Sequence, residues 1–211
     1  VSHPELIQSL INQGFLKTPL LIDAFKAIDR KFFVRPDDEA SAYINAPLLI
    51  GSGQTISQPL TVAFMLERFQ PKPQEKIMDV GAGSGWQTAL LAYVVGDKGK
   101  VCAIERIPDL CDFGKANVAK FNFIEHGVVK WFCQNATEGF LNEAPFDGIV
   151  VGAELKDLPA TWVTQLKDGG RILAPMDSAI VLWKKESGIL QKMMKWEGFS
   201  FVPFIYEVQK S

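Results

Sequence analysis

Residues 77–85 combine a short apolar run with glycines at alternate positions, in the order Ile-Met-Asp-Val-Gly-Ala-Gly-Ser-Gly. The apolar run predicts a buried strand, and the apolar residues from Thr88 to Val95 predict a helix soon after the glycines. Glycines allow positive φ angles and a close approach of the backbone to a ligand, and a helix N-terminus offers free N–H groups. The segment therefore predicts an α/β fold whose ligand site lies where this strand passes into this helix.

Strand-like and helix-like segments alternate after this glycine loop (residues 81–85). The predicted strands are Lys76–Val80, Val101–Ile104, Val128–Phe132, Gly148–Val151 and Arg171–Ala174. The helices predicted between them are Thr88–Val95, Leu110–Lys120 and Ala160–Leu166. Such alternation is typical of parallel strands joined by helical crossovers. We therefore expect a Rossmann-like, doubly wound, mostly parallel sheet with helices on both faces.

The two ends of the chain have a different pattern. Residues 4–28 predict two short amphipathic helices, residues 30–57 are irregular, and residues 58–69 return to helical spacing. After residue 175, three strand-like segments follow one another without helices, which predicts antiparallel strands at one edge of the sheet: Ile180–Lys184, Leu190–Trp196 and Phe199–Tyr206. We expect one domain, with a substrate-side segment at 1–57, a cofactor-binding core at 58–175 and C-terminal antiparallel strands at 176–211.

Neither the charge nor the hydropathy of the chain gives a reason to propose a nucleic-acid or membrane partner. The net charge is −2 over 211 residues, so nothing marks a surface for polyanionic nucleic acid or for membranes. No apolar run approaches the roughly 18 residues that span a bilayer, and no basic flank leads into an apolar core near the first residues. We expect a cytoplasmic protein, acting as a monomer, with no nucleic-acid or membrane partner.

The cysteines and histidines offer little for metal or hydrolase chemistry. The chain has three cysteines, Cys102, Cys111 and Cys133, and none forms a Cys-x-x-Cys pair. We expect buried, reduced thiols rather than a disulfide or a zinc site. His3 and His126 are the only histidines, and neither lies in a metal-binding or triad motif. No metal is expected.

The spacing of the glycine loop separates two classes of cofactor. A dinucleotide site requires Gly-x-Gly-x-x-Gly, whereas position 86 is Trp, which would crowd a pyrophosphate against the helix. Glu105 ends the next predicted strand 20 residues beyond Gly85, where a carboxylate can accept hydrogen bonds from both ribose hydroxyls. Gly-x-Gly-x-Gly preceded by an acid, here Asp79, resembles motif I of class I S-adenosylmethionine-dependent methyltransferases. The resemblance implies S-adenosyl-L-methionine as cofactor and S-adenosyl-L-homocysteine as product.

The segment before the loop narrows the resemblance. Residues 43–51 read Tyr-Ile-Asn-Ala-Pro-Leu-Leu-Ile-Gly and residues 54–59 read Gln-Thr-Ile-Ser-Gln-Pro. They resemble the Tyr-x-Asp-x-Pro-Leu-x-Ile-Gly and Gly-Gln-Thr-Ile-Ser sequences of protein-L-isoaspartate O-methyltransferases. Ala-Pro-Phe-Asp at 144–147, Gln-Leu-Lys-Asp-Gly-Gly-Arg at 165–171 and Phe-Val-Pro at 201–203 extend the similarity over nearly the whole chain.

The family resemblance implies the reaction and its residues. The enzymes transfer a methyl group to the free α-carboxylate of L-isoaspartyl residues in damaged proteins, and the ester then closes to a succinimide, which initiates repair. Ser57 is implied as the active-site hydroxyl, and Asn45, Ile50 and Val202 as substrate-binding residues. The residues implied to bind the cofactor are Gln54, Thr55, Ile56, Asp79, Gly81, Ala82, Gly83, Gly85, Glu105, Asn135 and Ala136.

The chain departs from the family pattern at two sites. Asn45 stands where the family has Asp, and Gln134-Asn135-Ala136 stands where the usual sequence is Gly-Asp-Gly. Asn135 keeps an acceptor oxygen for the adenine amino group but loses the negative charge. These departures leave two alternatives open: a methyltransferase of the same fold acting on a small molecule or RNA, and an inactive S-adenosylmethionine-binding module. Ser57 also has a structural alternative, as the N-cap of the helix that follows it.

Overall fold

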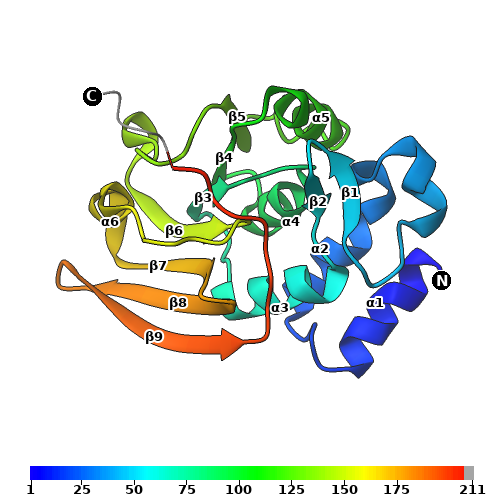
Figure 1. Cartoon of the computed structure of the whole chain (residues 1–211), viewed down its shortest axis with the longest axis horizontal. Coiled ribbons are helices and arrows are strands. Elements are labelled where there is room, and N and C mark those ends of the chain that lie inside the picture. The colour runs from blue at the N-terminus through cyan, green and yellow to red at the C-terminus, as the bar shows by residue number, and fades with distance from the viewer. Residues whose placement is uncertain (207–211) are drawn as a thin grey trace.

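The computed structural model describes residues 1–206 around one seven-stranded sheet (Figure 1). Its strands are β3 (Lys76–Val80), β4 (Lys100–Glu105), β5 (Val129–Cys133), β6 (Phe146–Val151), β7 (Leu166–Met176), β8 (Ala179–Glu186) and β9 (Ile189–Glu197). They lie in the order β5-β4-β3-β6-β7-β8-β9. The strands from β5 to β7 pair in parallel, and β8 and β9 are antiparallel additions at one edge. The predicted mostly parallel sheet with antiparallel edge strands is confirmed.

Each central strand is buried on both faces, as its nearly continuous apolar sequence requires. On β3, Ile77 packs into one hydrophobic cluster while Met78 and Val80 pack into another on the opposite face. The first cluster includes side chains from three helices, α3 (Pro59–Phe69), α4 (Trp86–Val95) and α5 (Pro108–Ala119). The second includes Trp162 of helix α6 (Ala160–Gln165). Helices therefore cover both faces of the sheet, although they do so unequally.

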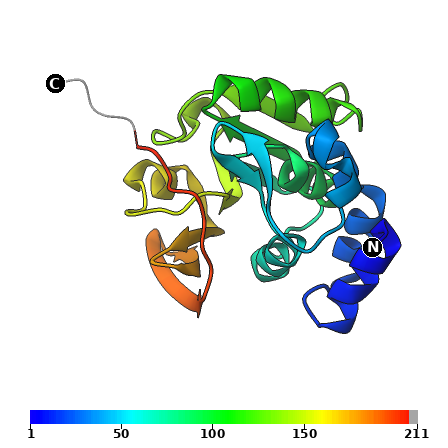
Figure 2. The ribbon, with the colours of Figure 1, turned by 45° about the vertical axis from the view of Figure 1, so that its right-hand side comes forward.

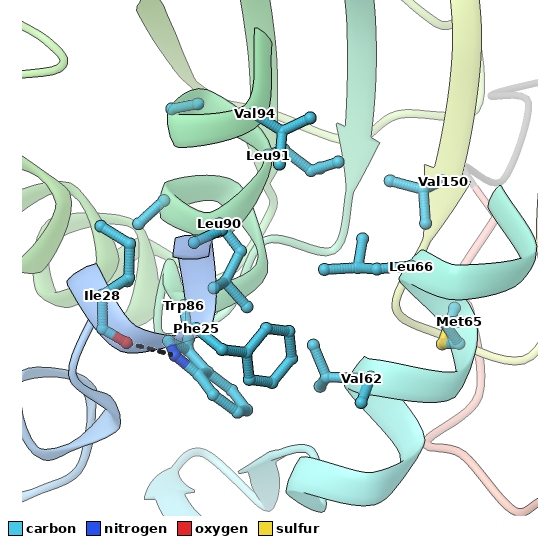
Figure 3. Close-up of a cluster of buried hydrophobic side chains, with 14 of the residues drawn as sticks. Phe25, Ile28, Val62, Met65, Leu66, Trp86, Leu90, Leu91, Val94 and Val150 are labelled. Atoms are coloured by element: carbon cyan, nitrogen blue, oxygen red, sulfur yellow. Dashed lines mark hydrogen bonds between the residues drawn. The ribbon is translucent and has the colours of Figure 1, made fainter. Parts of the chain in front are cut away.

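Prolines mark the start of most helices. The helices are α1 (His3–Asn12), α2 (Pro19–Ala27), α3 (Pro59–Phe69), α4 (Trp86–Val95), α5 (Pro108–Ala119) and α6 (Ala160–Gln165). A proline occupies the first position of α2, α3 and α5, where its missing N–H costs no hydrogen bond. Helix α1 has a capping box between Ser2 and Glu5. Figure 3 shows Phe25 of α2 and Trp86 of α4 packed beside Val62 of α3, which joins the N-terminal helices to the core.

The stretch from 30 to 57 is more regular than expected. It contains two short 3-10 helices, η1 (Arg30–Phe33) and η2 (Pro36–Ser41), and a hairpin of β1 (Leu48–Gly51) with β2 (Gln54–Ile56). A further 3-10 helix, η3 (Leu141–Glu143), follows β5. Among residues 1–206, no helix has the length and apolar character needed to cross a membrane.

The prediction of a strand over Phe199–Tyr206 is wrong. After β9 the chain leaves the sheet (Figure 2). It then makes one isolated bridge, between Glu154 and Pro203. Pro203 has no N–H to donate to a ladder, which disfavours pairing along a sheet edge. We name residues 198–206 the C-terminal strap.

Candidate active site

The glycine loop begins at the carboxyl end of β3. The N–H groups of Gly81 and Ala82 donate to the carbonyl oxygen of Ile104 on β4, at 2.9 and 3.1 Å. Gly85 precedes α4 with a φ of 85°, and a Cβ there would lie 2.6 Å from Cγ2 of Val118 on α5. Only glycine fits this position without moving α5, so close packing requires the last glycine of the motif.

Asp79 holds the start of α4 from within the core. Its side chain is fully buried, and its carboxylate accepts hydrogen bonds from Thr88 Oγ1 at 2.6 Å and Gln87 Nε2 at 2.8 Å. Burial raises the pKa of Asp79 to about 6, while the hydrogen bonds from Thr88 and Gln87 favour its carboxylate form. Asp79 therefore orders the loop and the helix that follows it through these two bonds.

Glu105 connects the glycine loop to the next crossover. Its Oε2 accepts the N–H of Gly83 at 3.0 Å and its Oε1 accepts the N–H of Ile107 at 2.9 Å. Each carboxylate oxygen can accept more than one hydrogen bond. Glu105 thus keeps acceptor capacity for a ligand while it fixes the loop.

Two cavities open at the carboxyl ends of the parallel strands, where the strand order reverses on either side of β3. The first, named here the glycine-loop cavity, is lined by Ile50, Gln54, Thr55, Val80, Gly81, Gly83, Ile104, Glu105, Arg106, Ile107, Leu110, Gln134, Asn135, Ala136, Gly152, Ala153, Val202, Pro203, Phe204 and Ile205. The second, the Ser57 cavity, is lined by Pro47, Thr55, Ser57, Gln58, Thr61, Gly152, Ser200, Phe201 and Val202. Thr55, Gly152 and Val202 line both, so the two cavities are adjacent.

A smaller hollow also connects the two sides, and it includes Ile56, Ser57, Ala82 and Gly83 among its lining residues. Ser57 therefore lies between the glycine loop and the Ser57 cavity. This arrangement can hold two ligands in contact, one against the glycine loop and one beside the Ser57 hydroxyl.

Ser57 does not cap the helix that follows, so that structural alternative is wrong. The N-cap of α3 is Gln58, and the N–H of Leu60 donates to the side-chain oxygen of Asn45 at 3.0 Å. Gln58 Nε2 in turn donates to the carbonyl oxygen of Asn45 at 3.0 Å. Asn45 thus ties the segment before the hairpin to the N-terminus of α3, a position where Asn and Asp are both favourable caps. The Ser57 side chain is therefore not used as a helix cap, and it lines the Ser57 cavity.

The buried side chain of Arg30 fixes the same segment through its backbone carbonyl groups. Its side chain is 1% exposed, and its guanidinium donates to the carbonyl oxygens of Ala42 at 2.6 Å, Ala46 at 3.0 Å and Ser57 at 3.1 Å. A longer contact of 3.4 Å reaches the carbonyl oxygen of Ile44. Burial lowers the pKa of Arg30 to about 10, so it stays charged at neutral pH. Backbone carbonyls from both ends of the hairpin segment therefore converge on one buried cation.

A family model described as Protein-L-isoaspartate(D-aspartate) O-methyltransferase (PCMT) matches residues 1–209. The chain belongs to this family. A protein-L-isoaspartate O-methyltransferase from Methanopyrus kandleri is 37% identical over 98% of this chain and 92% of its own length. The corresponding protein from Methanococcus aeolicus is 35% identical over 95% of this chain and 92% of its own length.

The solved structures agree with the family assignment. A crystal structure from Plasmodium falciparum, described as a protein-L-isoaspartate O-methyltransferase in complex with S-adenosyl-L-homocysteine, has a TM-score of 0.86 at 25% identity. The match covers 97% of this chain and 99% of that one. The family resemblance drawn from the sequence and the Rossmann-like methyltransferase fold are both confirmed.

The structure brings most of the predicted site residues of this methyltransferase fold together. Those that line the cavities are Ile50, Gln54, Thr55, Ile56, Ser57, Gly81, Ala82, Gly83, Glu105, Asn135, Ala136 and Val202. Asn45, Asp79 and Gly85 line none of these three cavities and instead support the loops around them. Their contacts with cofactor and acceptor stay predictions.

Sequence reasoning missed two residues that shape the site. Arg30 carries no motif of its own, because its partners are carbonyl groups brought together only by the fold. Gly114 lies inside α5, and a Cβ there would lie less than 2.5 Å from the carbonyl oxygen of Gly83 in the glycine loop. An isolated glycine within a helical pattern was the signal that could have found it.

The expectation of three reduced cysteines is wrong. Cys111, in α5, and Cys133, the last residue of β5, form a disulfide with Cα atoms 5.7 Å apart. Cys102 stays a buried free thiol. Each bonded cysteine is next in sequence to a residue of the glycine-loop cavity, Leu110 or Gln134. The crossover from α5 to β5 places the pair together, which residue spacing alone did not reveal.

Reducing this disulfide is expected to lower the free energy of unfolding by about 3 kcal/mol, the loop-entropy value for a closed loop of this size. The two cysteines are 22 residues apart in sequence. Denaturant unfolding with and without a thiol reductant measures the difference. A Cys111→Ser variant should have the stability of the reduced wild type both with and without reductant. A Cys102→Ser variant keeps the disulfide, so reductant should destabilise it as it does the wild type. Equal stability of the wild type in both conditions would contradict the prediction.

Proposed function

We propose that this protein transfers a methyl group from S-adenosyl-L-methionine to the free α-carboxylate of L-isoaspartyl residues in damaged proteins, and so initiates repair through a succinimide. The observation that carries the proposal is the adjacency of the glycine-loop cavity and the Ser57 cavity, which meet at Thr55, Gly152 and Val202. A two-ligand reaction requires such a meeting point. Membership of the isoaspartyl methyltransferase family identifies the two ligands.

The residues of the glycine-loop cavity fit this cofactor. S-adenosyl-L-methionine supplies an electrophilic methyl group on a sulfonium. Glu105 faces the cavity with spare acceptor capacity, which suits a ribose diol, and the backbone of Gly81 and Gly83 lines the wall without side chains. Leu110 and Ala136 add apolar surface suited to an adenine ring. The cavity thus offers polar and apolar groups in the proportion that a nucleoside needs.

The Ser57 cavity suits an acceptor that is already a nucleophile. None of the described residues that line it is charged, and none is a histidine. A carboxylate at neutral pH needs no general base, so a cavity that lacks one can still serve it. Methyl transfer from a sulfonium to a carboxylate removes charge from both reactants, so exclusion of water and alignment of the two ligands favour the step. Ser57, between the two cavities, would hold the carboxylate in line.

We further propose that the acceptors are isoaspartyl proteins and peptides, and that the enzyme acts on them as a monomer in the cytoplasm, where the Cys111–Cys133 disulfide would be exposed to reducing thiols. The net charge of −2 gives no surface field for nucleic acid. Asn45 does not weigh against the substrate, because its side-chain oxygen is used on the N–H of Leu60.

The direct test is methyl transfer to an isoaspartyl peptide compared with its twin that contains normal Asp. We expect labelling of the first peptide and little of the second. Equal labelling of both, or labelling of neither, would overturn the proposal. Labelling of a small molecule or RNA in place of the isoaspartyl peptide would indicate another methyltransferase on the same fold.

A Ser57→Ala variant is expected to lower kcat by about a hundredfold, because loss of alignment between reacting groups has effects of this size. Its affinity for S-adenosyl-L-homocysteine, measured by calorimetric titration, should change little, since Ser57 is absent from the glycine-loop cavity. Ser57→Thr keeps the hydroxyl and is the matched control, with partial recovery of kcat. Undiminished turnover in Ser57→Ala would remove Ser57 from the proposed role.

A further inference from the structure

The C-terminal strap forms a wall of both cavities. Phe201 and Val202 line the Ser57 cavity, and Val202 to Ile205 line the glycine-loop cavity. Figure 2 shows the strap running as an extended chain from the end of β9 toward the carboxyl ends of the parallel strands. The strap pairs with no strand of the sheet; Phe199, Phe201 and Phe204 pack against the hydrophobic core, and hydrogen bonds hold its backbone on either side of the glycine-loop cavity.

One side of the strap is attached to the segment after β6. The N–H of Glu154 donates to the carbonyl oxygen of Val202, and the N–H of Phe204 donates to the carbonyl oxygen of Glu154, both at 2.8 Å. The hydroxyl of Tyr206 accepts the N–H groups of Lys156 at 3.0 Å and Asp157 at 2.8 Å. These bonds fix the strap on the β6 side of the glycine-loop cavity.

On the opposite side, after β5, the contact comes from Asn135. Its Nδ2 donates to the carbonyl oxygen of Ile205 at 2.9 Å. Its Oδ1 accepts both the N–H and the Oγ1–H of Thr137, at 2.8 and 2.7 Å. A carboxamide oxygen has two lone pairs, so these bonds use the acceptor capacity of the side chain and fix its amino group toward the strap.

We infer that Asn135 is a positioning residue that latches the C-terminal strap across the glycine-loop cavity, in place of the expected contact of its oxygen with adenine. The latch joins the β5 side of the cavity to Ile205, while Glu154 anchors the strap on the β6 side. The strap is thereby held closed over the cofactor, and Val202 is held where the two cavities meet. Asn135 acts on both ligands through the strap.

An Asn135→Asp variant tests the latch because it preserves the side-chain shape and the acceptors for Thr137 but removes the donor. It also places a carboxylate oxygen against the carbonyl oxygen of Ile205. We expect the dissociation constant for S-adenosyl-L-homocysteine to rise about tenfold. We also expect faster amide hydrogen exchange in peptides that cover residues 200–206. Asn135→Ala should weaken binding in the same direction.

The alternatives give different results. If the side-chain oxygen contacted adenine, Asn135→Asp would keep the cofactor affinity and only Asn135→Ala would lose it, and the latch would be overturned. Weaker binding without faster exchange of the strap would also overturn it, because the effect would then be local charge. The KM for the isoaspartyl peptide should rise with the cofactor dissociation constant in Asn135→Asp. That last readout alone rests on the proposed function, so titration and exchange decide the latch whether or not isoaspartyl activity is found.

Discussion

An Arg30→Met variant is expected to lose most of its activity and about 3 to 5 kcal/mol of folding free energy, because three buried carbonyl groups each lose a hydrogen bond from a charged donor. The guanidinium donates to the carbonyl oxygens of Ala42, Ala46 and Ser57 and approaches that of Ile44. Methionine fills part of the space but donates no hydrogen bond, so these buried carbonyls would lose their partner.

The loss of activity follows from the position of those carbonyls. Ala42 and Ala46 precede the β1–β2 hairpin and Ser57 follows it, so Arg30 joins the two ends of the segment that carries Ser57, the proposed active-site residue. The Cζ atom of Arg30 also lies 5.4 Å from the ring centre of Trp86, which is the first residue of α4 and follows the glycine loop. Without the cation, Ser57 and the glycine loop lose a shared support.

Denaturant unfolding and isoaspartyl methylation measure the two effects. The matched control is Arg68→Met, because Arg68 is exposed on α3 and stacks over Phe64 and Trp196 without any backbone acceptor that the structure records. We expect that control to change stability by less than about 1 kcal/mol, as for exposed cation–π pairs. Stability and activity of Arg30→Met equal to those of Arg68→Met would contradict the prediction.

The sequence predicted the central fold well because its signals are local. Strands β3 to β7 are apolar runs, separated by helical patterns except between β5 and β6, and the glycine loop marks the carboxyl end of β3. The prolines at positions 19, 59 and 108 fix the first turns of three helices. Helix α4 begins two residues earlier than predicted, at Trp86, because Gly85 with its positive φ ends the loop there.

The failures share a physical cause, which is contact between segments far apart in sequence. Asn45 caps α3 from 15 positions before Leu60, so no local pattern at Ser57 showed that the cap was already supplied. The strap has the apolar residues typical of a strand, but it makes only one isolated bridge, and Phe199 and Phe204 pack against Phe64 of α3 and Trp162 of α6. The Cys111–Cys133 pair depended on how α5 packs against the sheet.

The sequence predicted those site residues whose type suits contact with a ligand. It did not predict those whose type is required by packing or hydrogen bonding to another part of the chain. Glu105 was found from its distance to the glycine loop, and it lines the cavity. Asn135 was placed at the cavity correctly, but its hydrogen bonds to Thr137 and Ile205 became visible only in the structure. Gly114 was missed entirely, because its requirement comes from packing against the loop.

A Gly114→Ala variant is expected to weaken S-adenosyl-L-homocysteine binding by about a hundredfold, the upper part of the range for an overpacked site, although alanine favours a helix over glycine by about 1 kcal/mol. A Cβ at Gly114 would overlap the carbonyl oxygen of Gly83 and would lie 2.7 Å from the ring of Trp131. Neither group can move easily, because the first is a backbone carbonyl and the Trp131 ring packs against the hydrophobic core. The methyl group must therefore push the glycine loop away from α5.

Movement of the loop would break specific contacts that shape the cavity. Gly83 donates its N–H to Glu105 at 3.0 Å, and Asn117, one turn along α5, donates to the carbonyl oxygen of Ser84 at 3.1 Å. Calorimetric titration with S-adenosyl-L-homocysteine measures the affinity, and circular dichroism verifies that the variant stays folded. Lys115→Ala, at the next position and exposed, is the control and should bind as the wild type does. Wild-type affinity in a folded Gly114→Ala would mean that the loop can shift without loss of the site, and that α5 does not define its position.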